Sequence, residues 1–289
     1  MKRTTMTAMV TLTISAMAAI GSAQDMKMSL YERLGGIYKI AQGASNCVEM
    51  ESADMMLLKN SNFKMAVTGA PQPLVKFGLT AYLAHIAGGP QTAFFDVAAY
   101  DQGFMLSKKD RDHAWDIRWM AFQKAGVSKK DFMELKAKYN AMFMKAKPMM
   151  AEKEKFMDET SLYARLGGIA PISMVVDDFV NMLATDKTQL ENPHVVKSLT
   201  SGKITGAGLK YLVTEQLAMA AGGPFKYTGK SMKDSHKDLA ITEKQWGSAA
   251  GQVHGSGQRA RRNLHRHLVD PRRYRERRRK VGIQERGQR

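Results

Sequence analysis

The segment LKYLVTEQLAMAAGGPFKYTGKSMKDSHKDLAIT, residues 209–242, decides the fold expected for the second half of the chain. Four of its apolar residues recur at helical spacing and predict one apolar helix face: Leu209, Val213, Leu217 and Ala220. Thr214 and Glu215 fall on other faces of this helix. The helix is expected to end at the Gly-Gly-Pro sequence of residues 222–224, because glycine adopts the left-handed C-terminal conformation and proline cannot continue the hydrogen-bond ladder.

A histidine follows the polar loop after this helix. His236 is expected on a short lysine-rich turn beyond the apolar helix face. A neutral imidazole is a good axial ligand for haem iron, and apolar side chains above it would exclude water. The alternative is a solvated surface histidine among Lys230, Lys233 and Lys237. The residues alone leave both interpretations open.

Three separated motifs resemble the group 1 truncated haemoglobins, which are small two-over-two helical globins. The motifs are AGGPFKYTGKSMKDSH at 221–236, SLYARLGGI at 161–169 and VVDDFVNML at 175–183. The resemblance implies that His236 is the proximal ligand of a haem cofactor. It also implies a diatomic gas (O2, NO or CO) as the bound partner, with a reductase as a possible second partner.

The resemblance also locates the distal side of the haem. Relatives often place a tyrosine after the phenylalanine of the second helix and a glutamine on the distal helix, and both donate hydrogen bonds to bound oxygen. In this chain Val180 follows Phe179, and the distal positions nearest the iron are Leu209 and Val213. A hydrogen bond to a charge-bearing ligand contributes about 1.5–3 kcal/mol, so an apolar distal pocket would retain oxygen less strongly.

The remaining pocket residues follow from the same resemblance. They are Gln216, Leu217, Tyr227 and Met232. Gln216 either reaches the ligand or is solvated, while Tyr227 and Met232 line the haem edge or pack the loop. Nitric oxide dioxygenation, an activity found in relatives, is less well supported without the tyrosine, so gas binding is the expected function and enzymatic activity stays open.

The first 23 residues have the pattern of a signal peptide. Lys2 and Arg3 precede an apolar stretch, and Gly-Ser-Ala at 21–23 offers a small-residue cleavage site. The apolar stretch is short for a membrane span, so a periplasmic or secreted protein without a membrane segment is expected, with an uncleaved anchor as the alternative. Cys47 is the single cysteine, which excludes an internal disulfide.

An internal repeat organises the chain into two tandem globin-like all-α domains. SLYERLGGI at 29–37 returns as SLYARLGGI at 161–169, and AGGP at 87–90 returns at 221–224, with spacings of 132 and 134 residues. We expect a first domain over 24–150, a linker over 151–160 and a truncated globin domain over 161–246.

The first copy lacks the histidine of the second. The residue as far past Pro90 as His236 lies past Pro224 is Gln102, and its neighbours Asp101 and Gly103 are no better ligands. Two histidines elsewhere, His85 and His113, are expected to be surface or boundary residues. Helices over about 107–124 and 128–147 are predicted from the helix-start signals Ser-Lys-Lys-Asp at 107–110 and 128–131. The first domain is thus expected to be a degenerate scaffold that packs or binds a partner.

Residues 247–289 form a basic tail of different composition. Residues 259–289 hold 12 arginines and one lysine, whereas residues 1–258 hold 5 arginines and 26 lysines. Apolar periodicity fades where the repeat requires two last helices, which favours a frame-shifted replacement of them. A solvated tail and an arm that binds nucleic acid or anionic membrane are the alternatives. No specific nucleic acid is expected, since Tyr274 stands alone among the arginines.

Two other classes of function remain. The chain has 22 methionines, and thioethers select Cu(I), so an exported copper-binding protein is one alternative. The pairs to consider are Met26/Met28, Met55/Met56, Met142/Met144 and Met149/Met150. Most of them also suit core or exposed helix positions. A structural, partner-binding protein is the other alternative.

Overall fold

The computed structural model describes residues 28–149 and 158–268, with side chains as far as Arg259. Throughout these ranges every regular element is a helix, which confirms the all-α class. The chain divides into two compact units, Met1–Lys153 and Glu154–Arg289. The expected signal peptide and most of the expected linker lie outside the described residues. Of the helices described, none is both long and apolar enough to cross a membrane.

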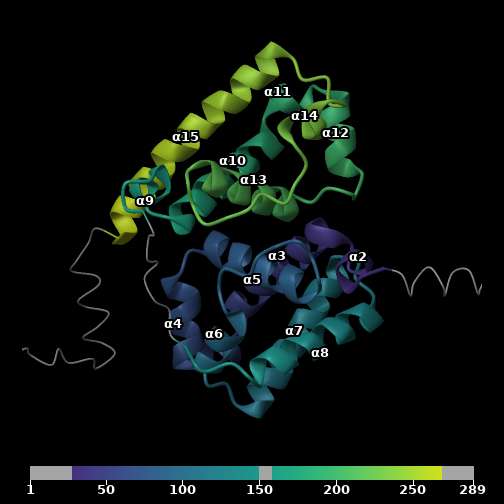
Figure 1. The fold of residues 1–289 in the computed structure, drawn as a ribbon, viewed down its shortest axis with the longest axis vertical. Helices are drawn as coiled ribbons and strands as arrows, with labels where there is room; N and C mark the ends of the chain where they lie inside the picture. Colours follow the sequence, from purple (N-terminus) through teal and green to yellow (C-terminus); the bar gives the residue numbers. More distant parts are fainter. Residues whose placement is uncertain (1–27, 150–157, 269–289) are drawn as a thin grey trace, which may run out of the picture. The chain divides into compact units, whose positions relative to one another are not determined.

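The first unit is built around helix α3. Its elements are α2 (Leu30–Arg33), α3 (Gly36–Ala53), the 3-10 helix η1 (Leu57–Lys59), α4 (Ser61–Gly69), α5 (Gln72–Ile86), α6 (Val97–Gly103), α7 (Lys108–Lys124) and α8 (Lys129–Phe143). Helix α3 packs against α5 on one side and α7 on another, and α8 contacts α2, α5, α6 and α7 (Figure 1). The last helix of this unit therefore packs against four of its other elements.

Helices α7 and α8 each begin after a serine cap, as the sequence predicts. The Ser107 hydroxyl accepts a hydrogen bond from the Asp110 amide, and the Ser128 hydroxyl accepts one from the Asp131 amide, both at 3.1 Å. Each cap satisfies a backbone donor that the first helical turn leaves without a partner. Helix α8 ends at Phe143, four residues before the predicted end.

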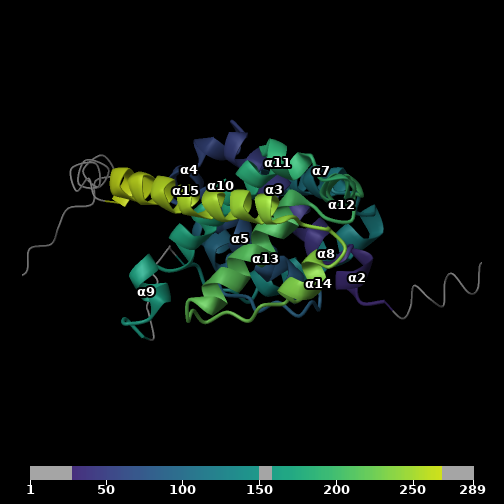
Figure 2. The same ribbon diagram turned by 90° about the horizontal axis from the view of Figure 1, so that it is seen from above.

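The second unit is built around helix α10. Its elements are α9 (Leu162–Leu166), α10 (Ile169–Thr185), α11 (Lys187–Leu190), α12 (Pro193–Thr200), α13 (Gly206–Ala220), α14 (Met232–His236) and α15 (Glu243–Leu268). Helix α10 packs against α13 and α15, and Figures 1 and 2 show α15 running alongside α10. The helices from α9 to α15 follow the same order as the elements from α2 to α7. In the described part of this unit no helix follows α15 to take the place that α8 has in the first.

The two repeated motifs contact each other in the same way in each unit. The Tyr163 amide donates to the carbonyl oxygen of Ala221 at 2.8 Å, and the Tyr31 amide donates to that of Ala87 at 3.0 Å. A Cβ atom on Gly223 would lie 2.6 Å from the Tyr163 ring. A glycine is therefore needed at this position because the tyrosine ring occupies the space of a side chain.

Helix α15 continues through the expected domain boundary after Trp246. It begins with the predicted capping box, in which the Thr242 amide donates to Oε1 of Gln245 at 3.0 Å and the Gln245 amide donates to Oγ1 of Thr242 at 3.3 Å. Ser256, well beyond the boundary, is fully buried. The start of the expected tail is thus a packed part of the second unit.

The buried face of α13 differs from the expected one. The side chains buried there include Tyr211, Thr214 and Glu215, whereas Leu217 is 41% exposed. Thr214 is accommodated because its hydroxyl donates to the Lys210 carbonyl oxygen at 2.7 Å. The assignment of Thr214 and Glu215 to outer faces was wrong, because hydrogen bonds within the unit offset the cost of burying these polar groups.

Candidate functional site

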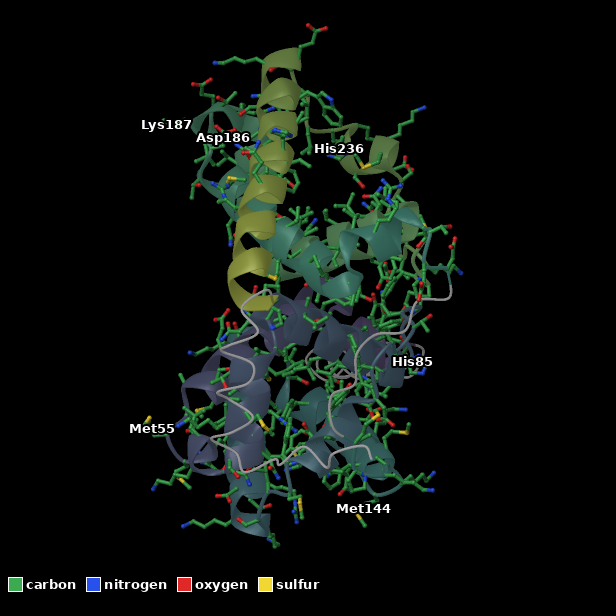
Figure 3. The ribbon with its side chains drawn as sticks, turned by 90° about the vertical axis from the view of Figure 1, so that its left-hand side faces the viewer. Met55, His85, Met144, Asp186, Lys187 and His236 are labelled. Carbon is green, nitrogen blue, oxygen red and sulfur yellow. The ribbon has the colours of Figure 1, made fainter. Side chains whose placement is uncertain are left out.

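His236 is the last residue of the short helix α14. Ser231 caps the start of this helix, and its hydroxyl accepts a hydrogen bond from the Asp234 amide at 3.0 Å. One turn later, Nδ1 of His236 lies 2.8 Å from the carbonyl oxygen of Met232. Because a carbonyl oxygen only accepts, Nδ1 carries the proton, and Nε2 keeps its lone pair for a metal. The half-buried imidazole is labelled in Figure 3.

An open groove of about 700 Å³ lies beside this imidazole. It is lined by Lys233, His236, Lys237, Ala240, Ile241, Thr242, Glu243, Trp246 and Gly247. The rings of His236 and Trp246 meet edge to face with centroids 6.2 Å apart. A volume of this size is within the range of small-molecule and cofactor sites, about 300–1,000 Å³.

The predicted distal residues lie on two other helices of the same unit. Val180 is buried on α10, and on α13 Leu209, Val213 and Gln216 are half-buried while Leu217 is exposed. None of these five residues lines the groove beside His236. The structure therefore places the imidazole next to the start of α15, and the distal assignment stays a prediction.

The loop between α13 and α14 contains contacts of its own. The Tyr227 hydroxyl donates to the Lys230 carbonyl oxygen at 2.8 Å, so Tyr227 packs within the loop. Met232 is 48% exposed, and it contributes its carbonyl oxygen to His236. A place for either residue at the haem edge stays a prediction.

Glu215 connects this loop to α13, a role that the sequence did not reveal. Its side chain accepts hydrogen bonds from the amide and the hydroxyl of Thr228, at 2.6 and 2.7 Å, and from the Tyr211 hydroxyl at 3.1 Å. Burial raises the pKa of Glu215, and the bonds from Thr228 and Tyr211 act against that rise. The usable signal was the single carboxylate of this helix. Glu215 thereby positions the loop that leads to His236.

In the first unit the counterpart of His236 has a structural role. The Gln102 side-chain amide donates to the Phe143 carbonyl oxygen at 2.7 Å and so ties α6 to α8. Its neighbour Asp101 accepts a bond from the Arg118 guanidinium at 2.9 Å. The side chains of Gln102 and Asp101 thus make contacts between helices.

A buried ion-pair network surrounds Asp101. Arg118 also pairs with Glu51 at 2.7 Å, and Tyr139 donates a short hydrogen bond to Asp101. The guanidinium carbon of Arg118 lies 5.0 Å from the Trp115 ring centroid. Burial raises the pKa of Glu51, while the neighbouring Arg118 lowers it. The network thus places paired charges beside the apolar core of the first unit.

The two histidines of the first unit are also partnered. Nε2 of His113 lies 2.9 Å from a carboxylate oxygen of Asp54, and Nδ1 of His85 lies 3.0 Å from the Gln91 carbonyl oxygen. The described residues contain no group of three or more His, Cys, Asp or Glu side chains arranged to hold a metal ion.

The methionine pairs in the described ranges are mostly exposed. Met55 and Met144 are 76% and 79% exposed, and Figure 3 shows both pointing away from the ribbon. The partner of Met144, Met142, is 45% exposed. Met26 and Met150 lie outside the described residues. No observation here favours a copper site over ordinary surface positions.

The all-helical fold, with an imidazole held at the end of α14, is the arrangement expected of a globin-like protein. Over 117 residues the chain is 32% identical to the group 1 truncated hemoglobin GlbN of Mycolicibacterium paratuberculosis (strain ATCC BAA-968 / K-10). The match covers 39% of this chain and 69% of that relative. The chain therefore belongs to the group 1 truncated haemoglobins. No family model matches it. No solved structure matches it either.

Proposed function

We propose that this protein binds haem through His236 in its second unit and captures a diatomic gas there. The single observation that carries the proposal is the hydrogen bond from Nδ1 of His236 to the Met232 carbonyl oxygen, which fixes the ring and leaves Nε2 available. His236 would hold the haem, which would supply an iron atom able to bind O2, NO or CO.

The distal residues are proposed to exclude water and to offer no hydrogen bond. Val180 stands where many relatives have a tyrosine, and Leu209 and Val213 are apolar. Among the residues proposed for the distal side, Gln216 is the one with an amide donor. Without a donor close to the gas, oxygen is expected to leave faster than from a pocket that has a tyrosine, by about one to two orders of magnitude.

We propose that the first unit is a tandem copy without haem. The support is the position of Gln102 and Asp101, whose side chains are used in contacts with Phe143 and Arg118. The unit would serve as a packing or partner-binding scaffold. Export to the periplasm or the medium is proposed from the pattern of residues 1–23 alone.

A haemin titration of the full chain tests the ligand. We expect a Soret band that saturates at one haem per chain, and its loss or large shift in His236→Ala. External imidazole should restore the band in His236→Gly, because it replaces the missing ring without changing the rest of the site. His194→Ala, an exposed histidine on α12, is the matched control. A Soret band that is unchanged in His236→Ala would overturn the proposal.

Flash photolysis of the haem-loaded protein tests the apolar distal side. The rate of oxygen release should be high in the unaltered chain and should fall by about tenfold or more in Val180→Tyr, which adds a hydroxyl donor. Val180→Phe adds a ring of similar size without the hydroxyl and is the control. Slow release from the unaltered chain would show that another donor reaches the gas.

A further inference from the structure

The same nine-residue motif is buried in one unit and exposed in the other. Leu30 and Leu34 in SLYERLGGI are 4% and 0% exposed, whereas Leu162 and Leu166 in SLYARLGGI are 49% and 47% exposed. The two sequences differ at one position, so local sequence does not explain the difference. The difference in exposure comes from the element that packs over the motif.

In the first unit the cover is helix α8. This helix contacts α2, and its apolar residues Phe132, Leu135 and Tyr139 are buried. In the second unit, within the described residues, no helix lies after α15 to make the corresponding contact. Leu162 and Leu166 are therefore an apolar face without the helix that covers its counterpart.

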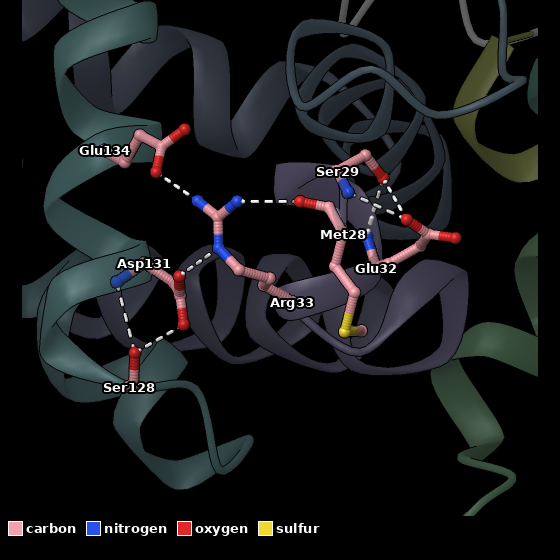
Figure 4. A network of polar contacts seen from close by, with 7 residues as sticks. All are labelled: Met28, Ser29, Glu32, Arg33, Ser128, Asp131 and Glu134. Atoms are coloured by element: carbon pink, nitrogen blue, oxygen red, sulfur yellow. Dashed lines mark hydrogen bonds and ion pairs between the residues drawn. The ribbon is translucent and has the colours of Figure 1, made fainter. Parts of the chain in front are cut away.

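The charges of the motif identify what the missing helix carries. In the first unit Nε of Arg33 donates to Asp131 of α8 at 2.8 Å, and another guanidinium nitrogen pairs with Glu134 one turn along (Figure 4). Arg165 is the counterpart of Arg33, is exposed, and makes no ion pair with any described residue. Its guanidinium is free to bind a carboxylate.

Neither α8 nor the C-terminal end of the chain suits this face. The inner side of α8 is already buried in the first unit. Residues 269–289 hold eight arginines and one lysine against three acids, so they would repel Arg165, and their sequence has no repeated apolar stripe.

We propose that the face formed by Leu162, Arg165 and Leu166 binds an amphipathic helix of a partner protein. The partner helix carries an apolar stripe spaced like Phe132, Leu135 and Tyr139, with carboxylates at the positions of Asp131 and Glu134. The proposal does not depend on haem binding.

A peptide of residues 127–147 of this chain is the probe. A fluorescein-labelled peptide, mixed with the full-length protein, should show a rise in fluorescence anisotropy. A second version, stapled between positions 133 and 137, both exposed in α8, excludes failure through an unstable peptide helix. Leu166→Asp should weaken binding by about tenfold or more, because it places a charge where the bound helix would bury an apolar side chain. Leu199→Asp, at a comparably exposed leucine on α12, should leave binding unchanged.

A charge exchange tests the orientation of the helix. Arg165→Glu should weaken binding of the original peptide, and a peptide with Asp131→Lys and Glu134→Lys should bind the Arg165→Glu protein better than it binds the unaltered one. The proposal would be overturned if neither the labelled peptide nor its stapled version binds the unaltered protein. It would also be overturned if Leu166→Asp does not weaken their binding. Self-association of the chain that Leu166→Asp abolishes, without peptide binding, would instead assign the face to a second copy.

Discussion

The carboxylate of Glu215 accepts two hydrogen bonds from Thr228, one from the backbone amide at 2.6 Å and one from the hydroxyl at 2.7 Å. The two residues are 13 positions apart, on α13 and on the loop that leads to α14. The contact thus joins the helix proposed to lie on the distal side to the segment that carries the proposed ligand.

Removal of this carboxylate should destabilise the second unit. Glu215→Ala leaves the Thr228 amide and hydroxyl and the Tyr211 hydroxyl without their acceptor, so we expect a loss of about 1–3 kcal/mol in the free energy of unfolding at pH 7. Urea titration followed by circular dichroism, and by Trp246 fluorescence in a background with Trp115→Phe and Trp119→Phe, measures it. Glu191→Ala, at an exposed glutamate on the surface, should change the same quantity by less than about 1 kcal/mol.

Glu215→Gln should have a different, pH-dependent effect. Burial raises the pKa of Glu215 above its ordinary value of 4.5, so the protonated form is favoured in the folded state. The stability that this group contributes is complete below the ordinary value and is lost as the pH rises through the folded-state pKa. The stability of Glu215→Gln relative to the unaltered chain should therefore increase between pH 4 and pH 7. A difference that is constant with pH would contradict this assignment.

Gly223→Ala should destabilise the second unit through the tyrosine of the repeated motif. The added Cβ would lie 2.6 Å from the Tyr163 ring, so the ring or the turn has to move. Overpacking of this kind costs about 1–3 kcal/mol, and thermal unfolding measures it. Gly206→Ala is the matched control, since a Cβ there has no atom within 4 Å. Equal effects of the two substitutions would argue against the close approach.

Arg118→Ala should strongly destabilise the first unit, because it leaves the carboxylates of Glu51 and Asp101 buried without their cation. The expected loss is about 3–5 kcal/mol at pH 7. The loss should shrink at acid pH, because removal of Arg118 lets the pKa of Glu51 rise further and its protonation then relieves the buried charge. Urea unfolding followed by the fluorescence of Trp115 and Trp119 in a Trp246→Phe background measures both effects.

The control for this experiment is a surface pair. Lys108→Ala removes the cation from an ion pair with Asp112 in which the lysine side chain is 85% exposed. It should change the unfolding free energy by less than about 1 kcal/mol and show little dependence on pH. A loss in Arg118→Ala as small as that of the control would show that the buried network contributes little.

Truncation should reveal how much of the basic tail belongs to the second unit. A chain that ends at Trp246 lacks the hydroxyl of Ser248 and the amide of Gln252, which donate to Asp186 at 2.6 and 2.7 Å, and it lacks buried Ser256. We expect it to lose the cooperative unfolding transition of the second unit. A chain that ends at Leu268 retains all of α15 and should keep it. Calorimetry of the two chains distinguishes these outcomes.

The sequence by itself determined those features that depend on neighbouring residues. Ser107 and Ser128 start helices because their hydroxyls satisfy the first free amides, and Thr242 with Gln245 does so reciprocally. Gly222, with a φ of 85°, follows the end of α13 because few other residues adopt that conformation. These are local interactions, and they need no knowledge of what packs around the helix.

Only the tertiary structure decided which faces are buried. Periodicity placed Glu215 on an outer face of α13, yet it is 3% exposed because Thr228 and Tyr211 donate hydrogen bonds to it from elsewhere in the fold. Likewise, Leu34 and Leu166 occupy the same place in nearly identical motifs, and one is buried while the other is exposed. Burial of the motif depends on an element that is distant in the sequence and packs against it. A nine-residue pattern does not predict whether that element is present.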